Sequence, residues 1–397
     1  MEDYAVVLNA GSSSLKFCIY QRPSAAPWRL EARGQIEGIG TSATFKVSNG
    51  GGAVVAESAL GAVADARGAL DALSGWLRSC YRGAKVLAVG HRVVHGGAQF
   101  SGPTVVTPEV VEALRSLIPL APLHQPYNLA AIDAVSERLP GVPQVACFDT
   151  SFHRGQPAVA ELVPLPADIR ARGVQRYGFH GLSYEYIASV LPEVAPNVAG
   201  GRVIVAHLGS GASLCALRDR RSVDSTLGFT ALDGLCMGTR PGALDPGVVL
   251  YLFQELGLTA KEVESLLYRK SGLIGISGVS NDMRDLLASD APAARLAVDY
   301  FVYRAVKEIG AMAAVLGGVD GLVFTAGIGE RSGAIRGRIC AASAWLGVEL
   351  DEAANDRGER CISRASSRVS TFVIPTNEEL MIARHTASVL GLVAART

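Results

Sequence analysis

Residues 5–20 read AVVLNAGSSSLKFCIY, and residues 203–217 read VIVAHLGSGASLCAL. Each stretch is an apolar run, a turn rich in glycine and serine, and a second apolar run, which is the pattern of a β-hairpin. The backbone N–H groups of such a turn form a concave, positively polarised nest that binds anions. Because the stretches lie roughly half a chain apart, we expect two similar domains whose turns face each other across a cleft that holds a phosphate-bearing ligand.

Length and composition favour two globular domains. A chain of 397 residues is longer than one hydrophobic core ordinarily accommodates. Lys+Arg and Asp+Glu are both 37, and this balance argues against a nucleic-acid or membrane-surface partner. The acidic start MEDYAVVLN is unlike a secretory signal, and no uncharged apolar stretch reaches the roughly 18 residues of a membrane span. The seven scattered cysteines include no CxxC pair, so we expect reduced thiols and a cytoplasmic location.

Strand and helix patterns alternate in both halves, which predicts an α/β protein. We place the domain boundary near residue 150, giving domains of residues 1–150 and 151–397. Besides the two hairpins, we expect strands at residues 30–38, 44–48, 53–57, 86–94, 142–148, 321–325 and 369–374, and helices at 62–81, 108–117, 129–139, 261–267, 293–316, from 332 onward and 378–392.

The first hairpin turn offers groups that bind phosphate. Gly11 permits a tight turn, Ser12 and Ser14 carry hydroxyls, and Lys16 adds a positive charge. Asn9 ends the first strand, where its amide oxygen is placed to face a hydrated metal ion. A plain hairpin turn has the same composition and remains an alternative. The Walker A pattern is absent from the sequence.

Two arginines stand in segments bounded by glycine. Arg92 lies within the apolar stretch GHRVVHGG (residues 90–97), and Arg240 lies within LCMGTRPG (residues 235–242). An arginine in an apolar strand normally faces a carboxylate or a phosphate, so a structural ion pair competes with anion binding for Arg92. For Arg240 the alternative to an anion clamp is a solvated loop side chain.

Acidic residues and a histidine mark three further motifs. Asp149 in FDTSFH ends a strand, Glu378 in IPTNEE begins a helix, and His180 stands in RYGFHG. Functional groups collect at the carboxyl ends of strands in α/β sheets. Helix capping for Asp149, helix-dipole stabilisation for Glu378 and a structural role for His180 remain alternatives.

The motif AGIGER (residues 326–331) lies between an expected strand and an expected helix, where glycines let a ligand approach the backbone. With Gly333 and Glu349 it is also a loose dinucleotide fingerprint. The glycine spacing is off by one, and too little chain follows for a dinucleotide domain. A nicotinamide dehydrogenase is therefore the weakest of the functions considered.

Together these stretches resemble the acetate kinase family. VLNAGSSSLKF, GHRVVHGG, APLH, FDTSFH, RYGFHG, HLGSGAS, MGTR, DPG, SGLIGISG, FTAGIGE and IPTNEE occur in that family's order from end to end. The family belongs to the acetate and sugar kinase, heat-shock chaperone and actin superfamily. The resemblance implies two duplicated ribonuclease-H-like domains with a cleft between them, the acyl substrate on the N-terminal side, the nucleotide on the C-terminal side, and the last helix packing back on the N-terminal domain.

The resemblance also implies an activity: reversible in-line transfer of the γ-phosphoryl group of ATP to acetate, giving acetyl phosphate and ADP, with Mg²⁺ or Mn²⁺, in a homodimer. Acetate is ionised at neutral pH and needs no general base, so we expect Asp149 to orient an arginine or a metal-bound water. The roles implied are metal binding by Asn9 and Glu378; catalysis by Arg92, Asp149, His180 and Arg240; phosphate contacts from Ser12, Ser14, Lys16, His207, Leu208, Gly209, Ser210 and Gly211; nucleoside contacts from Asp282, Met283, Arg284, Gly327, Ile328, Gly329, Glu330 and Arg331; and an acyl pocket of Arg92, Val94, Leu123, Phe179 and Ala231.

The chain departs from the family pattern near the implied sites. The family usually has Asn at the positions of Ser210 and Arg331, Pro at that of Ala231, and Ser and Asp at those of Pro241 and Ala243. These departures affect the expected rate, nucleotide preference and acyl selectivity more than the reaction class. A kinase for propionate or another short-chain carboxylate is the alternative within that class. An actin-like or chaperone-like ATPase is the alternative outside it, and it requires neither the arginine pair nor an apolar pocket.

Overall fold

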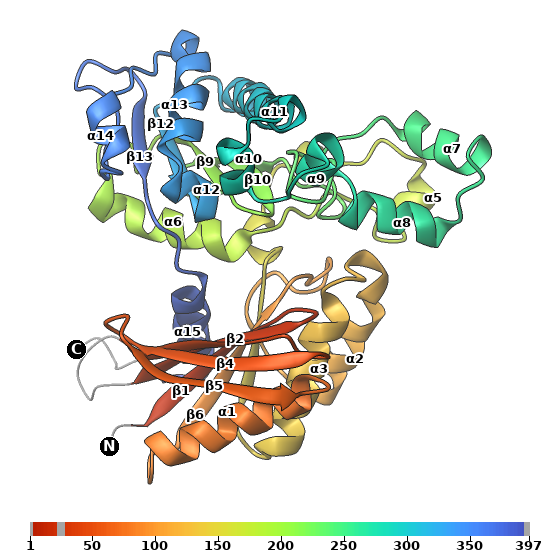
Figure 1. Cartoon of the computed structure of the whole chain (residues 1–397), viewed down its shortest axis with the longest axis vertical. Helices are drawn as coiled ribbons and strands as arrows, with labels where there is room; N and C mark the ends of the chain where they lie inside the picture. The colour runs from red at the N-terminus through yellow and green to blue at the C-terminus, as the bar shows by residue number, and fades with distance from the viewer. Residues whose placement is uncertain (1–2, 22–27, 393–397) are drawn as a thin grey trace. The chain divides into compact units, whose positions relative to one another are not determined.

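The computed structural model describes residues 3–21 and 28–392, and the chain divides into two compact units (Figure 1). The first unit comprises the chain up to Ser151 and again from Asn377, and the second comprises Phe152–Thr376. The chain therefore leaves the first unit and returns to it with its last helix. Strands and helices alternate in both units, so the predicted α/β class is confirmed. Within the described residues no helix is both long and apolar enough to cross a membrane.

The first unit is built on one mixed sheet, whose order in the described residues is β5-β4-β3-β2-β1-β6-β8-β7. Strands β1 to β5 form an antiparallel meander, and β1, β6 and β8 run parallel. The elements are β1 (Tyr4–Ala10), β2 (Ser14–Gln21), β3 (Arg29–Glu37), β4 (Ser42–Asn49), β5 (Val54–Ala62), β6 (Val86–Val93), β7 (Thr104–Val105), β8 (Gln144–Phe148), α1 (Ala66–Cys80), α2 (Pro108–Ser116), α3 (Gln125–Arg138) and α15 (Glu378–Val389).

The second unit repeats the centre of this plan with the order β11-β10-β9-β12-β13. An antiparallel meander is again followed by two parallel strands, so β9 corresponds to β1 and β12 to β6. The elements are β9 (Arg202–Leu208), β10 (Ala212–Arg218), β11 (Arg221–Ser225), β12 (Gly321–Thr325), β13 (Ser370–Val373), α4 (Ala158–Glu161), α5 (Ala167–Arg170), α6 (Gly181–Val194), α7 (Pro246–Gln254), α8 (Ala260–Arg269), α9 (Gly272–Ser277), α10 (Met283–Ala288), α11 (Pro292–Leu316), α12 (Ala326–Arg331), α13 (Gly333–Ala342) and α14 (Glu352–Asp356).

Helices cover both faces of the first sheet. Val89 of β6 joins a core with residues of α1 and α3. Its neighbour Gly90 points to the other face, because side chains alternate along a strand. A Cβ on Gly90 would lie 2.7 Å from Cγ2 of Ile382 on α15, so glycine lets this helix pack directly on β6. The helix begins at Glu378, where the side chain of Asn377 caps it by accepting from the N–H of Leu380.

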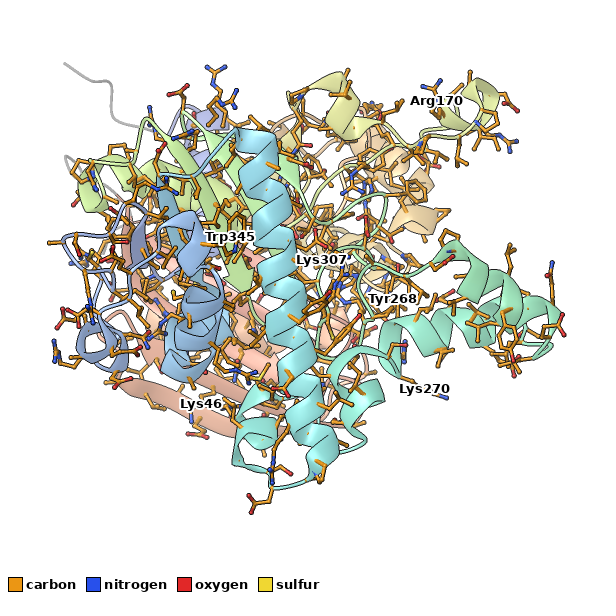
Figure 2. All side chains as sticks on the ribbon, turned by 90° about the horizontal axis from the view of Figure 1, so that it is seen from above. Lys46, Arg170, Tyr268, Lys270, Lys307 and Trp345 are labelled. Atoms are coloured by element: carbon orange, nitrogen blue, oxygen red, sulfur yellow. The ribbon has the colours of Figure 1, made fainter. Side chains whose placement is uncertain are left out.

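The second sheet is covered by α6 on one face. Tyr184, Ile187 and Leu191 of α6 form a core with Val205 of β9 and Cys215 of β10. The long helix α11 contacts β9 and β10 as well. Figure 2 shows α11 with Lys307 along it and Trp345 beside it, and a Cβ on Gly310 of this helix would lie 3.6 Å from the Trp345 ring.

Both predicted hairpins are confirmed, with β1 paired to β2 and β9 paired to β10. The helix expected at residues 62–81 begins later, at Ala66, because β5 extends to Ala62 and the Asp65 side chain caps the helix. The motif AGIGER, which we placed between a strand and a helix, itself forms the short helix α12. The stretch after His153 showed no periodicity in the sequence, and there the chain forms the four-residue helices α4 and α5.

Candidate functional site

The strand register of the first unit gathers polar side chains on the face of the sheet that α15 covers. Val7 of β1 pairs with Gly90, so Asn9, two residues further on, shares the face of Gly90 and Arg92. Lys16 pairs with Asn9 across the hairpin and points the same way. Arg92 pairs with Cys147 of β8, which places Asp149 on that face as well. Four of the predicted residues therefore share one face, at the end of the sheet where α15 starts.

Arg92 is held in a bidentate ion pair. Its Nε and Nη2 donate to the two carboxylate oxygens of Asp149 at 3.0 and 2.6 Å, and its Nε lies 3.8 Å from Oε2 of Glu378. Asp149 thus contacts an arginine, as we expected. The structural ion pair, which was the alternative interpretation of Arg92, is therefore present. Nη1 of Arg92 takes part in neither of the two hydrogen bonds to Asp149.

Glu378 is the acidic residue whose protonation this cluster perturbs most. Burial, together with the negative charges of Asp149 and Glu379, raises its pKa to about 7, although Arg92 and Lys16 oppose the shift. Burial lowers the pKa of Arg92, but Asp149 and Glu378 outweigh it and leave that pKa above its ordinary value. The cluster therefore carries more negative charge than its two cations balance, and an added cation would relieve the excess.

A divalent metal fits this charge excess if substrate supplies further ligands. Among the described residues no group of three or more His, Cys, Asp or Glu side chains is arranged to hold a metal ion. Mg²⁺ is usually bound by one or two protein oxygens together with water and substrate phosphates. The carboxylate of Glu378 and the amide oxygen of Asn9 match that donor set.

Two amides on α3 fix the segment that follows β6. Asn128 accepts from the backbone N–H of Val94 at 3.0 Å and donates to the carbonyl of Ala10 at 2.9 Å, which joins the ends of β6 and β1. Gln125 similarly bonds both backbone groups of His95. Val94 is buried beside these bonds. The sequence analysis did not identify the two amides, because both lie before the helix that it predicted at residues 129–139, whereas α3 begins at Gln125.

In the second unit, the first turn of α6 lies over the ends of β9 and β10. Ser213 pairs with His207 across this hairpin, so the two side chains share the face that α6 covers. Nδ1 of His180 lies 2.8 Å from Oγ of Ser213, and Nδ1 of His207 lies 2.8 Å from Oγ of Ser183. The two imidazole rings stack at 4.2 Å with an interplanar angle of 17°.

Arg240 lies next to His180 at the hairpin turn. A Cβ added to Gly211 would lie 2.8 Å from Nη2 of Arg240 and 3.3 Å from Nε2 of His180, so glycine is needed for both to approach. Nη1 of Arg240 donates to the carbonyl of Ala231 at 2.7 Å. Burial lowers the pKa of Arg240, and no ion pair to it is recorded among the described residues. Its guanidinium is therefore available to an anion.

A pocket of about 660 Å³ adjoins the same turn. Eight of the predicted residues line it, and Asn281, Leu287, Ala288 and Ser332 line it too, although the sequence did not reveal them. Leu287 follows Met283 by four residues on α10, which puts both on one helix face. The predicted residues that line the pocket are Gly209, Ser210, Asp282, Met283, Arg284, Gly327, Ile328 and Arg331.

Other predicted residues occupy structural positions near this pocket. Oε1 of Glu330 accepts from the backbone N–H of Ala326 at 2.8 Å and of Thr376 at 3.1 Å, which ties α12 to the end of the segment after β13. Leu208 is fully buried in β9. Arg336, which the sequence did not suggest, is buried and donates through Nη1 to the carbonyls of Gly329 and Glu330.

The remaining predicted residues are distributed over both units. Ser12 is exposed and Ser14 is half-buried at the first hairpin turn, and Leu123 is half-buried in the turn before α3. Phe179 is buried next to His180, and Ala231 is half-buried and bonded to Arg240 through its carbonyl. The first unit thus holds Val94 and Leu123, and the second holds Phe179 and Ala231.

The second sheet repeats the order of the five central strands of the first, and each has a glycine-containing hairpin turn, which defines a protein of the duplicated ribonuclease-H-like class. Comparison with known proteins identifies the family. The model of the acetokinase family matches residues 4–384. An acetate kinase from Rhodopseudomonas palustris is 54% identical over 391 residues, which cover 97% of this chain and 98% of the relative. The chain belongs to the acetokinase family.

Solved structures agree with this assignment. The crystal structure of an acetate kinase from Porphyromonas gingivalis matches with a TM-score of 0.87 and 37% identity, over 98% of this chain and 100% of that one. A propionate kinase from Francisella tularensis matches with a TM-score of 0.91 and 34% identity, over 97% and 99%. The predicted fold and family are therefore confirmed.

Glu378 provides a prediction about stability. Its pKa in the folded protein, about 7, lies above the ordinary value of 4.5. The protonated carboxyl therefore favours folding below about pH 4.5, and this contribution is lost as the pH rises through 7. We expect Glu378→Gln to gain stability over the wild type on going from pH 5 to pH 8, by on the order of 2–3 kcal/mol at about 1.36 kcal/mol per pKa unit.

Urea unfolding without divalent ions at both pH values measures this difference. Glu57→Gln, at an exposed glutamate paired with Lys46, is the matched control and should show little pH dependence. A difference between Glu378→Gln and wild type that stays constant from pH 5 to pH 8 would contradict the assignment.

Proposed function

We propose that this acetokinase-family enzyme transfers the γ-phosphoryl group of ATP to acetate, reversibly, to give acetyl phosphate and ADP. The observation that carries the proposal is the hairpin turn of residues 209–211. Gly209 and Ser210 line the 660 Å³ pocket, while Gly211 adjoins Arg240 and His180. A nucleotide in this pocket would present its terminal phosphate to Arg240, which forms no ion pair with a carboxylate in the described part of the chain.

The chemical problem of this reaction is to bring two anions together. A carboxylate oxygen of acetate attacks the γ-phosphorus, and the bond to the β,γ-bridging oxygen breaks, with charge spread over three equatorial oxygens. Arg240 and His180 are placed to meet that charge as donors. Asn9 and Glu378 would hold Mg²⁺, which neutralises phosphate charge when bound. Arg92, held by Asp149, supplies the positive charge on the first unit.

Hydroxamate trapping of acetyl phosphate tests the proposal directly. Purified protein with ATP, Mg²⁺ and acetate should yield acetyl hydroxamate, and Arg92→Ala and Arg240→Ala should each lower kcat by on the order of 10³-fold, because both remove a positive charge from the phosphoryl site. Arg138→Ala, which breaks an exposed ion pair with Asp71, is the matched control and should keep normal kcat.

Circular dichroism should show that the three variants remain folded. Normal turnover in a folded Arg92→Ala or Arg240→Ala variant would exclude that residue from the mechanism. ATP hydrolysis that is independent of acetate, with no hydroxamate formed, would instead favour the actin-like or chaperone-like ATPase.

The acyl selectivity is a second part of the proposal. A solved relative is a propionate kinase, so the family includes enzymes for more than one acid. We expect acetate to be preferred here, because the buried, β-branched Val94 of the first unit would leave little room for another methylene in an acyl pocket that contains it. One additional methylene in an apolar pocket changes the transition-state free energy by about 1–3 kcal/mol, or roughly 10–200-fold in kcat/KM. Because Ala231 is small where the family usually has proline, we expect a value toward the lower end of this range.

Ratios of kcat/KM for acetate and propionate in wild type and Val94→Ala measure this selectivity. The variant should narrow or invert the preference, because it enlarges the pocket. A wild type that favours propionate, or a variant with an unchanged ratio, would show that Val94 does not set selectivity.

We also propose that the enzyme is a cytoplasmic homodimer. All seven cysteines are free thiols, as a reducing compartment requires. Helices α7 and α8 project from the second sheet (Figure 1), and the apolar side chains exposed on and around α7 suit a self-complementary interface. These side chains are Leu244, Val248, Leu250, Tyr251, Phe253 and Leu256.

Analytical ultracentrifugation tests the dimer. The wild type should sediment as a dimer, and Leu250→Arg should shift it toward monomer, because a charge would be buried in the interface. Val54→Arg, at a similarly exposed valine on the edge strand β5, is the control and should remain dimeric. A monomeric wild type at micromolar concentration would contradict the proposal, and recovery of the protein with periplasmic markers would contradict the location.

A further inference from the structure

We propose that Ser213 and Tyr184 are positioning residues that hold the His180 ring in the tautomer whose Nε2 carries the proton, directed at the hairpin turn of residues 209–211. The catalytic part of this inference rests on the proposed function. Oγ of Ser213 lies 2.8 Å from Nδ1 of His180 and 2.5 Å from the phenol oxygen of Tyr184. Both Ser213 and Tyr184 are fully buried.

The chain of hydrogen bonds from Tyr184 through Ser213 to His180, which we call the relay, takes its direction from the acidities of the two hydroxyls. Oγ of Ser213 has a single proton, so it can donate to only one of its two neighbours. A phenol, with a pKa near 10, is a stronger hydrogen-bond donor than an aliphatic alcohol. Tyr184 therefore donates to Ser213, and Ser213 donates to Nδ1 of His180. A neutral imidazole that accepts at Nδ1 carries its proton at Nε2.

The backbone and a neighbouring ring fix the orientation of His180 as well. His180 precedes α6 in the left-handed region, with φ of 58°, which few residues other than glycine adopt. Its ring stacks on His207, whose own Nδ1 is bonded to Ser183. Both rings thus have Nδ1 at a serine hydroxyl and Nε2 near the turn, 3.3 Å from a Cβ added to Gly211 for His180 and 4.0 Å from one added to Gly209 for His207.

The consequence for the reaction is a second donor beside Arg240. Nη2 of Arg240 and Nε2 of His180 both approach Gly211. With the proton on Nε2, a neutral His180 donates to a phosphoryl oxygen at that turn without first taking up a proton from solvent. If the proton were on Nδ1 instead, Nε2 would present its lone pair to the phosphoryl oxygen and repel it. Ser213 and Tyr184 affect the reaction only by determining which tautomer His180 adopts.

Nitrogen-15 NMR of histidine-labelled protein without ligands reads the tautomer directly. Wild-type His180 should show a protonated Nε2 and an unprotonated Nδ1, with His180→Ala providing the assignment. Ser213→Ala should convert this signature to a mixture of tautomers, because the Nδ1 partner is gone. Tyr184→Phe should weaken it less, because Ser213 then keeps its proton for His180. Ser183→Ala should alter the signals of His207 and leave the His180 tautomer unchanged.

Steady-state kinetics then link the tautomer to the reaction. Ser213→Ala should lower kcat by on the order of 10²-fold while KM for ATP changes little, since the ring is misdirected rather than the pocket altered. Tyr184→Phe should lower kcat by less than Ser213→Ala. Tyr177→Phe is the matched hydroxyl deletion, because its phenol donates to the backbone carbonyl of Gly173, and it should keep normal kcat. In a His180→Ala background, Tyr184→Phe and Ser213→Ala should add no further loss.

Three results would overturn the proposal: a protonated Nδ1 on wild-type His180, normal kcat and an unchanged tautomer in Tyr184→Phe and Ser213→Ala, or equal losses from these variants with and without His180. The last result would show a structural role. If Ser213→Ala does not fold, Tyr184→Phe decides by the same measurements. If the wild type forms no acetyl phosphate, the proposed function fails, while the NMR signature still decides whether the relay exists.

Discussion

The two units differ most in how they neutralise an arginine. Arg92 has both oxygens of Asp149 and lies near Glu378, so its charge is balanced within the protein. Arg240 has the carbonyl of Ala231 and no recorded ion pair among the described residues. A partly buried guanidinium without a carboxylate is unfavourable until an anion reaches it. An anion bound to Arg240 would offset this cost, so the charges of the second unit suit an anion and those of the first suit a cation.

The same local design produces both environments. In each unit a hairpin joins the central strand to its antiparallel neighbour, and a parallel strand pairs with the other edge of the central strand. Strand register then sets which side chains share a face. In the first unit this face collects Asn9, Lys16 and Arg92 under α15, and in the second it places His207 and Ser213 under α6. The same scaffold therefore carries different polar side chains at equivalent strand ends in the two units.

Much of this arrangement could be predicted from the sequence, because its signals are local. The hairpins, the apolar strands and Asp149 at the end of β8 follow from periodicity and turn chemistry. The contacts between distant segments could not be predicted in this way. Asn128 joins β1 to β6, and Glu330 binds the backbone of Thr376, over 118 and 46 residues of sequence. Nothing in the local pattern around either residue specifies a partner so far away.

The helical conformation of AGIGER has a different cause. Two glycines in six residues disfavour a helix by roughly 1 kcal/mol each relative to alanine, so propensity alone does not explain α12. Three side-chain bonds offset that preference: within α12, Glu330 accepts from the N–H of Ala326, and from outside it Arg336 of α13 donates to the carbonyls of Gly329 and Glu330. Of the two glycines, Gly327 leaves open space beside it. A Cβ on Gly327 would meet nothing within 4 Å, and this residue lines the pocket that the proposed nucleotide would fill. Side-chain bonds thus stabilise the short helix in spite of its glycines, and they leave Gly327 facing the pocket.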